Sequence, residues 1–342
     1  MYAAPDEAPP ARFPLSSSLP KGESDKGSLR ESHVNYVYRG RFAPSPTGPL
    51  HFGSLVAAVG SYLDAKHHQG IWLVRMEDLD APRTVLGAAD DILRTLEAFG
   101  LHWDENIIYQ SRRTAAYEDA LHQLQTIGTV YRCACTRREI ADSALHGIDG
   151  QIYPGTCRDG IPAGREGRAW RVRSDHLSRH SRENGNDDGN IQFDDALQGR
   201  VKQHLENDIG DFVVKRADGL FAYQLAVVVD DAFQNITHIV RGADLLSSTP
   251  RQIYLQRLLG LATPAYMHLP IAVNAQGEKL SKQTLAAAVD THNPAALLVR
   301  ALDFLQQNPP AGLAHCTPDE ILKWAAAHWE KARLSGMMQL PA

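Results

Sequence analysis

The sequence predicts an α/β fold with an open, mostly parallel sheet. Residues 36–42 alternate along the chain and are rich in β-prone side chains, so they predict a strand. The stretch 44–49 cannot be regular structure, because its prolines fix φ and remove hydrogen-bond donors. A helical apolar pattern over 51–67 follows, and then a short apolar run over 71–74 that predicts a buried strand. Strand, turn, helix and strand in this order form a βαβ unit, which is typical of an open α/β sheet.

Two more helices follow this unit. An amphipathic pattern predicts the first over residues 83–99, where Gly100 closes it, and the second over residues 117–127, where Gly128 ends it. Farther on, residues 174–190 are rich in Asn, Gly and Asp, and we expect a mobile loop there.

The second half of the chain is predicted to alternate strands and helices. Residues 211–229 show β-like alternation and an apolar run, with a hairpin expected at 217–219. A sheet strand is expected over 236–240 and a helix over 250–259. The remainder is rich in Ala and Leu and is predicted to be helical, with a proline break at 308–310.

Composition limits the class of protein. The chain of 342 residues has room for about two domains, and its 43% hydrophobic and 22% charged residues are ordinary for a soluble enzyme. No apolar run approaches the roughly 20 residues that span a bilayer, so we expect no membrane segment. Residues 1–35 are rich in Pro and Ser, contain acids and lack an apolar signal segment, which predicts a disordered extension rather than a targeting peptide. The net charge of -5 does not indicate nucleic-acid binding, but it does not exclude a stripe of basic residues on one face of the protein.

Three of the four cysteines lie close together in the sequence, at Cys133, Cys135 and Cys157, whereas Cys316 is far away. So few cysteines in a chain of this size, without a signal peptide, fit a reducing cytoplasm better than a secreted disulfide scaffold. Three thiolates can supply three ligands of a structural zinc site, which needs a fourth. His146 is a candidate for the fourth by its chemistry, and reduced, unliganded cysteines are an equally good explanation of the C-x-C spacing alone.

The first stretch suited to binding a triphosphate is RFAPSPTGPLHFGS, residues 41–54. His51 and Gly53 open the predicted helix directly after the first strand, and helix N-termini bind phosphate through free N–H groups. Gly53 allows a nucleotide to approach the backbone closely, and His51 can donate to a phosphoryl oxygen. Taken alone, these four residues would be an ordinary helix start.

The second such stretch is KLSKQ, residues 279–283, which follows a turn signal at 274–277. A lysine in a loop can neutralise the charge that builds on an α-phosphate during in-line attack. An isolated pair such as Lys279 and Lys282 is more often a solvated basic turn. Together with residues 41–54, however, the pair indicates activation of a carboxylate by ATP.

The two stretches together resemble the HIGH and KMSKS signatures of the class I aminoacyl-tRNA synthetases, and RFAPSPTGPLHFG is similar to the glutamate branch of that class. Further matching pieces are WLVRMEDLD, YRCACTRRE, YQLAVVVDDA and IVRGADLL, so the resemblance covers about residues 36–306. It implies a Rossmann-like catalytic domain at 36–270. Within it, residues 110–210 are expected to form an inserted, acceptor-binding-like subdomain with the zinc site. A KMSKS-like loop and a short helical C-terminal part are expected at 271–342.

The resemblance also implies roles for single residues. Arg41 would meet the γ-carboxylate of glutamate, because a guanidinium suits a planar anion, and Glu77 would accept from the α-ammonium. The implied glutamate-binding residues are Arg41, Phe42, Ala43, Pro44, Ser45, Glu77, Tyr223 and Arg241. Without the family context, Glu77 would be an acidic strand end, Tyr223 a half-buried strand aromatic and Arg241 part of a surface ion pair.

The implied ATP-binding residues are His51, Gly53, Lys279, Ser281 and Lys282. Of these, the resemblance implies that His51 and Lys282 are catalytic. The implied zinc ligands are Cys133, Cys135, Tyr153 and Cys157, with the Tyr153 phenolate completing the site and His146 remaining its competitor. The implied cofactors are one structural zinc ion, and Mg²⁺ with ATP.

The chain departs from the family pattern at Ser54, which stands for the second His of HIGH, and at Gln283, which stands for the final Ser of KMSKS. Only residues 284–342 follow, whereas a full glutamyl-tRNA synthetase continues into a large anticodon-reading domain. We therefore expect a monomeric, cytoplasmic, truncated paralogue. It would activate L-glutamate with ATP and transfer it to the queuosine base at the wobble position of tRNA(Asp). The alternatives are an ordinary synthetase that charges a tRNA 3′ end and a non-catalytic tRNA-binding scaffold.

Overall fold

The computed structural model describes residues 37–141, 146–147, 150–175, 189–280 and 287–342. The expected disordered extension at 1–35 lies outside the described residues, as do most of the expected loop at 174–190 and the positions Ser281 and Lys282. The described residues from Tyr38 to Ala342 belong to one compact unit.

Parallel strands form the centre of the molecule. β1 (Arg39–Phe42) pairs with β2 (Ile71–Met76), and β2 pairs in the same direction with β3 (Ile108–Tyr109). β11 (His238–Gly242) is parallel to β12 (Ala265–Leu269). The two groups are adjacent, because the backbone N–H of Thr237 donates to the carbonyl of Arg39 at 2.9 Å. The predicted α/β fold with parallel pairing is therefore confirmed.

Two further strands extend this sheet, the first by parallel and the second by antiparallel pairing. β8 (Asn190–Asp195) pairs with β12 through Asp195 and Tyr266, and β9 (Gly199–His204) returns antiparallel to β8. The short strands β13 (Ile271–Val273) and β14 (Gln339–Pro341) pair with each other.

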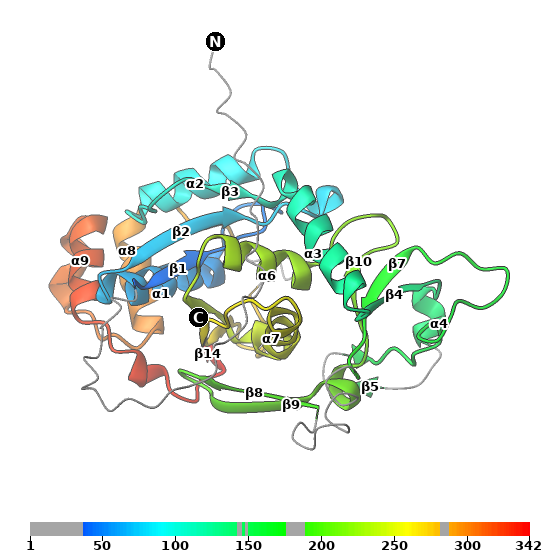
Figure 1. Ribbon diagram of the computed structural model, residues 1–342. Coiled ribbons are helices and arrows are strands. Elements are labelled where there is room, and N and C mark those ends of the chain that lie inside the picture. Colours follow the sequence, from blue (N-terminus) through cyan, green and yellow to red (C-terminus); the bar gives the residue numbers. More distant parts are fainter. Residues whose placement is uncertain (1–36, 142–145, 148–149, 176–188, 281–286) are drawn as a thin grey trace, which may run out of the picture. The chain divides into compact units, whose positions relative to one another are not determined.

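Two hydrophobic cores contain the principal helices. The first includes α1 (Phe52–His67), α8 (Pro294–Phe304) and α9 (Pro318–Ala327), which lie at the same end of Figure 1. Gly60 of α1 allows the helix to approach β12, since a Cβ there would sit 2.5 Å from Leu269. α2 (Ala88–Ala98) contributes Ile92 and Leu96 to the same core.

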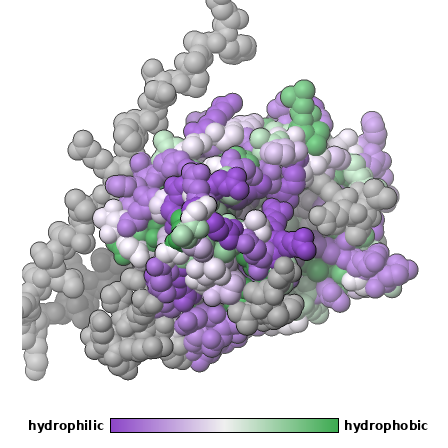
Figure 2. Space-filling view, turned by 90° about the vertical axis from the view of Figure 1, so that its right-hand side faces the viewer, coloured by the Kyte–Doolittle hydropathy of each residue, from purple (hydrophilic) through white to green (hydrophobic). Residues whose placement is uncertain are grey.

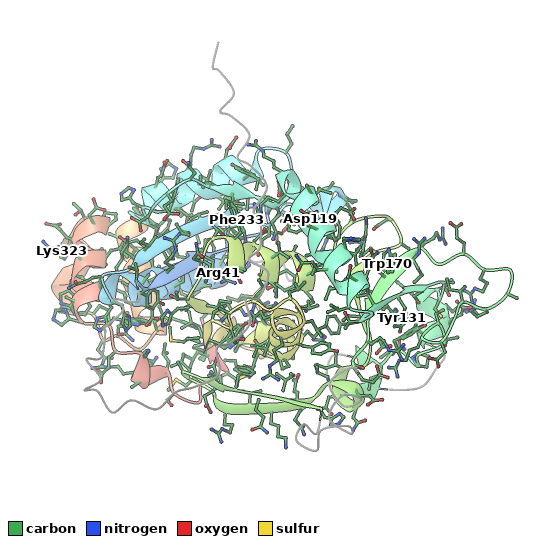
Figure 3. The ribbon with its side chains drawn as sticks, viewed as in Figure 1. Arg41, Asp119, Tyr131, Trp170, Phe233 and Lys323 are labelled. Carbon is green, nitrogen blue, oxygen red and sulfur yellow. The ribbon has the colours of Figure 1, made fainter. Side chains whose placement is uncertain are left out.

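The second core includes α3 (Thr114–Thr126), α6 (Tyr223–Phe233) and α7 (Thr249–Leu258). This core also contains side chains of a second, antiparallel sheet. The strand order in that sheet is β10 (Phe212–Lys215), β7 (Ala169–Val172), β4 (Val130–Cys133). Tyr131 and Trp170 lie on this smaller sheet, away from the central Arg41 (Figure 3). Hydrophilic side chains predominate on this side of the molecule, and hydrophobic ones form small patches (Figure 2).

Short elements complete the described chain. They are α4 (Arg137–Ala141), β5 (His146–Gly147), β6 (Gly150–Gln151), η1 (Ala81–Arg83), η2 (Gln110–Arg112), the π-helical η3 (Leu205–Ile209), η4 (Ala243–Ser248), η6 (Ala311–His315) and η7 (Lys331–Leu334). None of the helices in the described ranges is both long and apolar enough to cross a bilayer.

The predicted strand over residues 223–229 is wrong, because this segment is the helix α6. Consecutive valines favour a strand locally, yet the apolar run continues for the length of a helix. Packing against α3 and α7 buries most sides of α6, so the apolar run over residues 225–229 is suited to a buried helix. The turn at 217–219 does form, with Lys215 bridging to Phe221 beyond it.

The predicted start of the helix at residue 83 is also wrong. A 3-10 turn covers Ala81–Arg83, and α2 begins only at Ala88, after Gly87 in a left-handed conformation with φ of 79°. A residue in the left-handed conformation interrupts the helical path. The amphipathic pattern therefore predicted a helix that begins several residues before its actual start.

Candidate active site

A pocket of about 620 Å³ opens at the carboxyl ends of the parallel strands. Phe42 ends β1, Glu77 follows β2, and Arg241 lies near the end of β11, and all three line it. The first turn of α1 contributes His51 and Gly53. In open α/β sheets, ligands bind in this position, outside the carboxyl ends of the strands.

The N-terminus of α1 forms one wall of the pocket. His51 is its N-cap: Nδ1 accepts from the backbone N–H of Ser54 at 3.3 Å, and Nε2 lies 3.0 Å from the Ser54 hydroxyl. Because Nδ1 accepts, Nε2 carries the proton of a neutral ring and is the donor. The Nε2–H group of His51 then donates to the Ser54 hydroxyl, so the ring lies beside the free amides of the helix start, where an anion binds well.

The two sequence signatures meet here. Gly53 lies beside the KLSKQ stretch, because a Cβ on Gly53 would be 3.4 Å from the carbonyl oxygen of Leu280, an ordinary contact distance. Lys279 lines the same pocket and forms an ion pair with Asp244. Ser281 and Lys282 come next in the chain, outside the described residues.

Arg41 is held at the floor of the pocket by a buried carboxylate. Its Nε and Nη2 donate to Asp231 at 2.9 and 3.3 Å, and Nη1 of Arg75 donates to the same carboxylate at 2.8 Å. Burial opposes ionisation of Asp231, but the two guanidinium groups outweigh it and lower its pKa. One anion therefore fixes two buried cations, and Arg41 keeps its place beside the pocket.

Glu77 binds the second terminal nitrogen of Arg75, whose first terminal nitrogen binds Asp231. Nη2 of Arg75 donates to the Glu77 carboxylate at 3.2 Å. Burial raises the pKa of Glu77, and Arg75 and Arg41 oppose that rise. A substrate ammonium in the pocket would add a further positive partner and stabilise the carboxylate form.

Tyr223 and Arg241 are paired. Nη1 of Arg241 donates to the Tyr223 hydroxyl at 3.3 Å. Burial raises the pKa of Tyr223, so its phenol stays protonated at neutral pH. Tyr223 is the first residue of α6 rather than the strand aromatic that the sequence suggests, and this position turns its ring into the pocket lining.

The structure brings most of the sequence-predicted residues together. The pocket is lined by Arg41, Phe42, Ala43, Pro44, Ser45, His51, Gly53, Glu77, Tyr223, Arg241 and Lys279. Sequence reasoning missed Asp231 and Arg75 as the groups that hold Arg41. A signal existed, because charged residues stood inside otherwise apolar runs, and a buried charge requires a partner.

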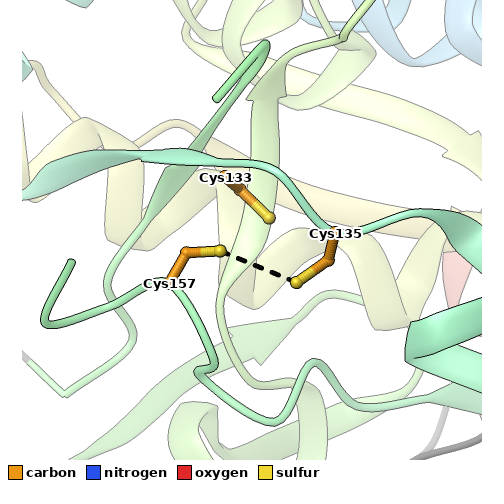
Figure 4. Close-up of side chains that lie close together, drawn as sticks. All are labelled: Cys133, Cys135 and Cys157. Atoms are coloured by element: carbon orange, nitrogen blue, oxygen red, sulfur yellow. Dashed lines mark hydrogen bonds between the residues drawn. The ribbon is translucent and has the colours of Figure 1, made fainter. Parts of the chain in front are cut away.

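The cysteine cluster lies beside the antiparallel sheet, outside this pocket. The sulfurs of Cys133, Cys135 and Cys157 all lie within 4.8 Å of one another, and the last two are 3.6 Å apart (Figure 4). The Tyr153 hydroxyl is 3.4 Å from the Cys133 sulfur and 3.5 Å from the Cys135 sulfur. The side chain of His146 lies outside what the structure describes.

These distances fit a tetrahedral metal site. Bonds of about 2.3 Å to sulfur and about 2.0 Å to oxygen place tetrahedral ligand atoms about 3.8 Å apart for S–S and about 3.5 Å apart for S–O. The distances of 3.4, 3.5 and 3.6 Å agree with these values. The three cysteines can hold a metal ion, and the Tyr153 hydroxyl, which accepts from the backbone N–H of Cys157 at 2.8 Å, lies beside two of the sulfurs.

Comparison with known proteins agrees with the fold. The model of the family described as tRNA synthetases class I (E and Q), catalytic domain, matches residues 38–308. The solved glutamate-tRNA synthetase of Elizabethkingia anophelis superposes with a TM-score of 0.67 at 22% identity, over 90% of this chain and 68% of that one. The described fold is thus that of a class I tRNA synthetase catalytic domain.

Curated relatives narrow the assignment. The glutamyl-Q tRNA(Asp) synthetase of Dechloromonas aromatica is 62% identical over 86% of this chain and 95% of its own length. The protein of the same name from Chromobacterium violaceum is 56% identical over 90% of this chain and 99% of its own length. The chain belongs to the glutamyl-Q tRNA(Asp) synthetase family.

Proposed function

We propose that this protein is a ligase that activates L-glutamate with ATP and transfers the glutamyl group to the queuosine base at the wobble position of tRNA(Asp). The observation that carries this proposal is the pocket. It combines two buried arginines, a carboxylate and a tyrosine with the phosphate-binding start of α1. The high identity to relatives named for this activity supports the choice of acceptor.

In the first step, a carboxylate oxygen of glutamate attacks the α-phosphorus of ATP, and the bond to pyrophosphate breaks. Arg41, Glu77, Tyr223 and Arg241 would orient the glutamate, and His51 would donate to a phosphoryl oxygen as negative charge builds on it. Lys279, Ser281, Lys282 and Gly53 complete the proposed ATP site, with Mg²⁺ accompanying the nucleotide. Catalysis by positioning and charge stabilisation needs no protein nucleophile.

In the second step, a hydroxyl group of the queuosine base attacks the glutamyl carbonyl and AMP leaves. Beyond the proposed glutamate site, Arg216 and Phe221 also line the pocket of about 620 Å³. An anticodon loop is a suitable partner, because its bases can be splayed out of the stack.

The acceptor decides between this proposal and its rivals. Labelled glutamate should pass to tRNA(Asp) only when queuosine is present, and the product should survive removal of the 3′-terminal adenosine. Charging of unmodified tRNA(Glu) at its 3′ end would identify an ordinary glutamyl-tRNA synthetase instead. Absence of glutamate-dependent ATP–pyrophosphate exchange would favour a non-catalytic tRNA-binding scaffold.

We also propose a structural zinc ion held by Cys133, Cys135, Cys157 and Tyr153. Residues 110–210 would then form an insertion pinned by the metal within a catalytic domain at 36–270. The KMSKS-like loop and a helical part at 271–342 would follow that domain. When bound, zinc would supply a cross-link between chain segments and take no part in the reaction. Asp211 strengthens the same region, since it accepts hydrogen bonds from Arg158, Tyr131 and Ser174.

Purified protein should contain about one zinc per chain, and Cys135→Ser should lose it, because structural zinc requires four good ligands. Metal analysis by mass spectrometry measures the content directly. Cys316→Ser is the matched control, since that cysteine lies outside the cluster, and it should retain the metal. Freshly reduced wild-type protein without zinc would contradict the proposal.

A further inference from the structure

Arg241 is supported from behind by groups that do not line the pocket. Its Nε donates to Nε2 of His268 at 3.1 Å, and its Nη2 donates to the Thr249 hydroxyl at 2.8 Å. Nη1 carries the bond to Tyr223 on the pocket side. The guanidinium plane is therefore defined by contacts on its Nε edge, while its Nη1 side faces the pocket.

His268 is able to play this part in only one of its protonation states. The Nε–H group of an arginine is always a donor, so the Nε2 atom facing it must be an acceptor. That requires a neutral ring whose proton is on Nδ1. Nδ1 lies 2.6 Å from Oδ2 of Asp195, which is the partner such a proton needs. His268 and the Asp195 side chain are both fully buried, so no water competes for these bonds.

The other oxygen of Asp195 is already occupied. Oδ1 accepts from the backbone N–H groups of Leu197 and Gln198 at 3.0 and 2.9 Å, and of His268 itself at 3.3 Å. These three bonds fix the carboxylate, so only Oδ2 is presented to the imidazole. Asp195 comes from β8, which pairs with the strand of His268, and Arg241 comes from the strand on the other side of β12.

We propose that Asp195 and His268 act as positioning residues that fix the guanidinium of Arg241 for a carboxylate of glutamate, with Asp195 selecting the Nδ1–H tautomer of His268. This inference rests on the proposed function, in which Arg241 belongs to the glutamate site. Neither positioning residue lines the pocket, and both act through Arg241 alone.

The electrostatic surroundings keep the ring neutral. Burial lowers the pKa of His268, the hydrogen bond with Asp195 opposes that change, and Arg241 adds to the lowering. Asp244 on η4 acts in the same direction as Asp195, and the Tyr266 ring stacks on the imidazole at 6.2 Å between centroids. Because the pKa lies below its ordinary value of 6.5, the ring stays an acceptor at pH 7 and charges only at lower pH.

The test replaces Asp195 by asparagine in the full chain. The three backbone donors require an oxygen at the Oδ1 position, so the amide NH₂ of Asp195→Asn faces Nδ1. The ring then accepts at Nδ1 and carries its proton on Nε2, against the Nε–H of Arg241. In glutamate-dependent pyrophosphate exchange, we expect the glutamate KM to rise about 10–100-fold, by comparison with other outer-sphere positioning partners. The KM for ATP should stay within about twofold.

The tautomer itself is measured by ¹⁵N NMR of histidine-labelled protein. The His268 signals are assigned by their loss in His268→Gln. Wild-type protein should show protonated Nδ1 and bare Nε2 at pH 7.5, and Asp195→Asn should show the reverse. A wild-type ring with protonated Nε2, or a charged ring, would overturn the proposal. This readout requires no catalysis, so it separates failure of the inference from failure of the proposed function, which an inactive wild-type protein would reveal.

Two further variants separate positioning from stability. His268→Gln can place an amide oxygen near the Nε2 position and should keep the glutamate KM within about tenfold of wild type, whereas His268→Phe fills the space without an acceptor and should raise it as Asp195→Asn does. Asp64→Asn is the matched control for a buried carboxylate, because Asp64 accepts from Tyr38 and Trp329 away from the pocket. It should lower the unfolding temperature and leave the glutamate KM unchanged. Equal KM values for Asp195→Asn and Asp64→Asn would refute the positioning role.

Discussion

Replacing His51 by asparagine should lower glutamate-dependent pyrophosphate exchange about a hundredfold or more. The side chain caps α1 through Nδ1, and in the proposed function its Nε2 donates to a phosphoryl oxygen of ATP. Asparagine is a good N-cap, so the helix should begin normally in this variant. What is lost is one preorganised donor to a developing oxyanion, and such a loss typically costs about 10²–10³ in rate.

The measurement is exchange of labelled pyrophosphate into ATP at saturating glutamate, together with the unfolding temperature. His51→Ala removes the cap as well, so it should lose the same activity and also some stability, about 0.5–2 kcal/mol for a lost N-cap. Lys282→Ala, predicted from the sequence at a position outside the described residues, should lose activity to a similar degree. Exchange within a few-fold of wild type in His51→Asn would remove His51 from the catalytic assignment.

Replacing Asp231 by alanine should lower the free energy of unfolding by about 3–5 kcal/mol. The carboxylate is the shared partner of Arg41 and Arg75, and all three side chains are buried. Removing one member of a buried ionic group leaves the others desolvated without compensation. Arg41 also loses the contacts that hold it beside the pocket. The KM for glutamate should therefore rise steeply in the fraction of the variant that folds.

Chemical denaturation followed by circular dichroism gives the stability. Two controls make the result specific. Asp194 is also an aspartate paired with an arginine, Arg200, but this pair is exposed. Asp194→Ala should barely change the denaturation midpoint, because exposed ion pairs contribute little to stability. Asp230→Ala removes the adjacent buried carboxylate, which binds Arg113 and Tyr117 instead, so it should destabilise the protein without releasing Arg41. A mild effect of Asp231→Ala, equal to that of Asp194→Ala, would show that the two arginines do not depend on it.

Residues whose function depends on local conformation could be found from the sequence. His51 and Gly53 follow a strand and open a helix, so their place at a helix N-terminus was predictable from hydrophobic periodicity and proline punctuation. The three neighbouring cysteines indicated a common site by their spacing, and the structure gathers their sulfurs. The resemblance to a family then predicted the remaining residues of the pocket, and the structure brings those it describes together.

The same local reasoning gave the wrong conformation for residues 223–229. A run of valine, alanine and leucine has no amphipathic period, and its strand propensity is a weak preference of the isolated chain. The conformation is decided by the neighbours, because α3 and α7 bury the surface that a helix of this composition presents. Tyr223 reached the pocket from the start of a helix, where the sequence placed it on a strand.

The sequence by itself determined which residues are available for the proposed chemistry: a helix start suited to phosphate, two lysines in the KLSKQ stretch and a cluster of thiols. The resemblance to the family added the side chains proposed for the glutamate site. Only the tertiary structure decided how those side chains are held. Arg41 binds Asp231, which is 190 residues away in the sequence. Arg241 binds His268, 27 residues away, and His268 in turn binds Asp195, 73 residues away. A buried charge must find a partner of opposite charge or a matching hydrogen-bonding group, but nothing in the local pattern says which one. The partner is chosen by the pairing of strands and the packing of helices, which bring distant residues to the same buried position.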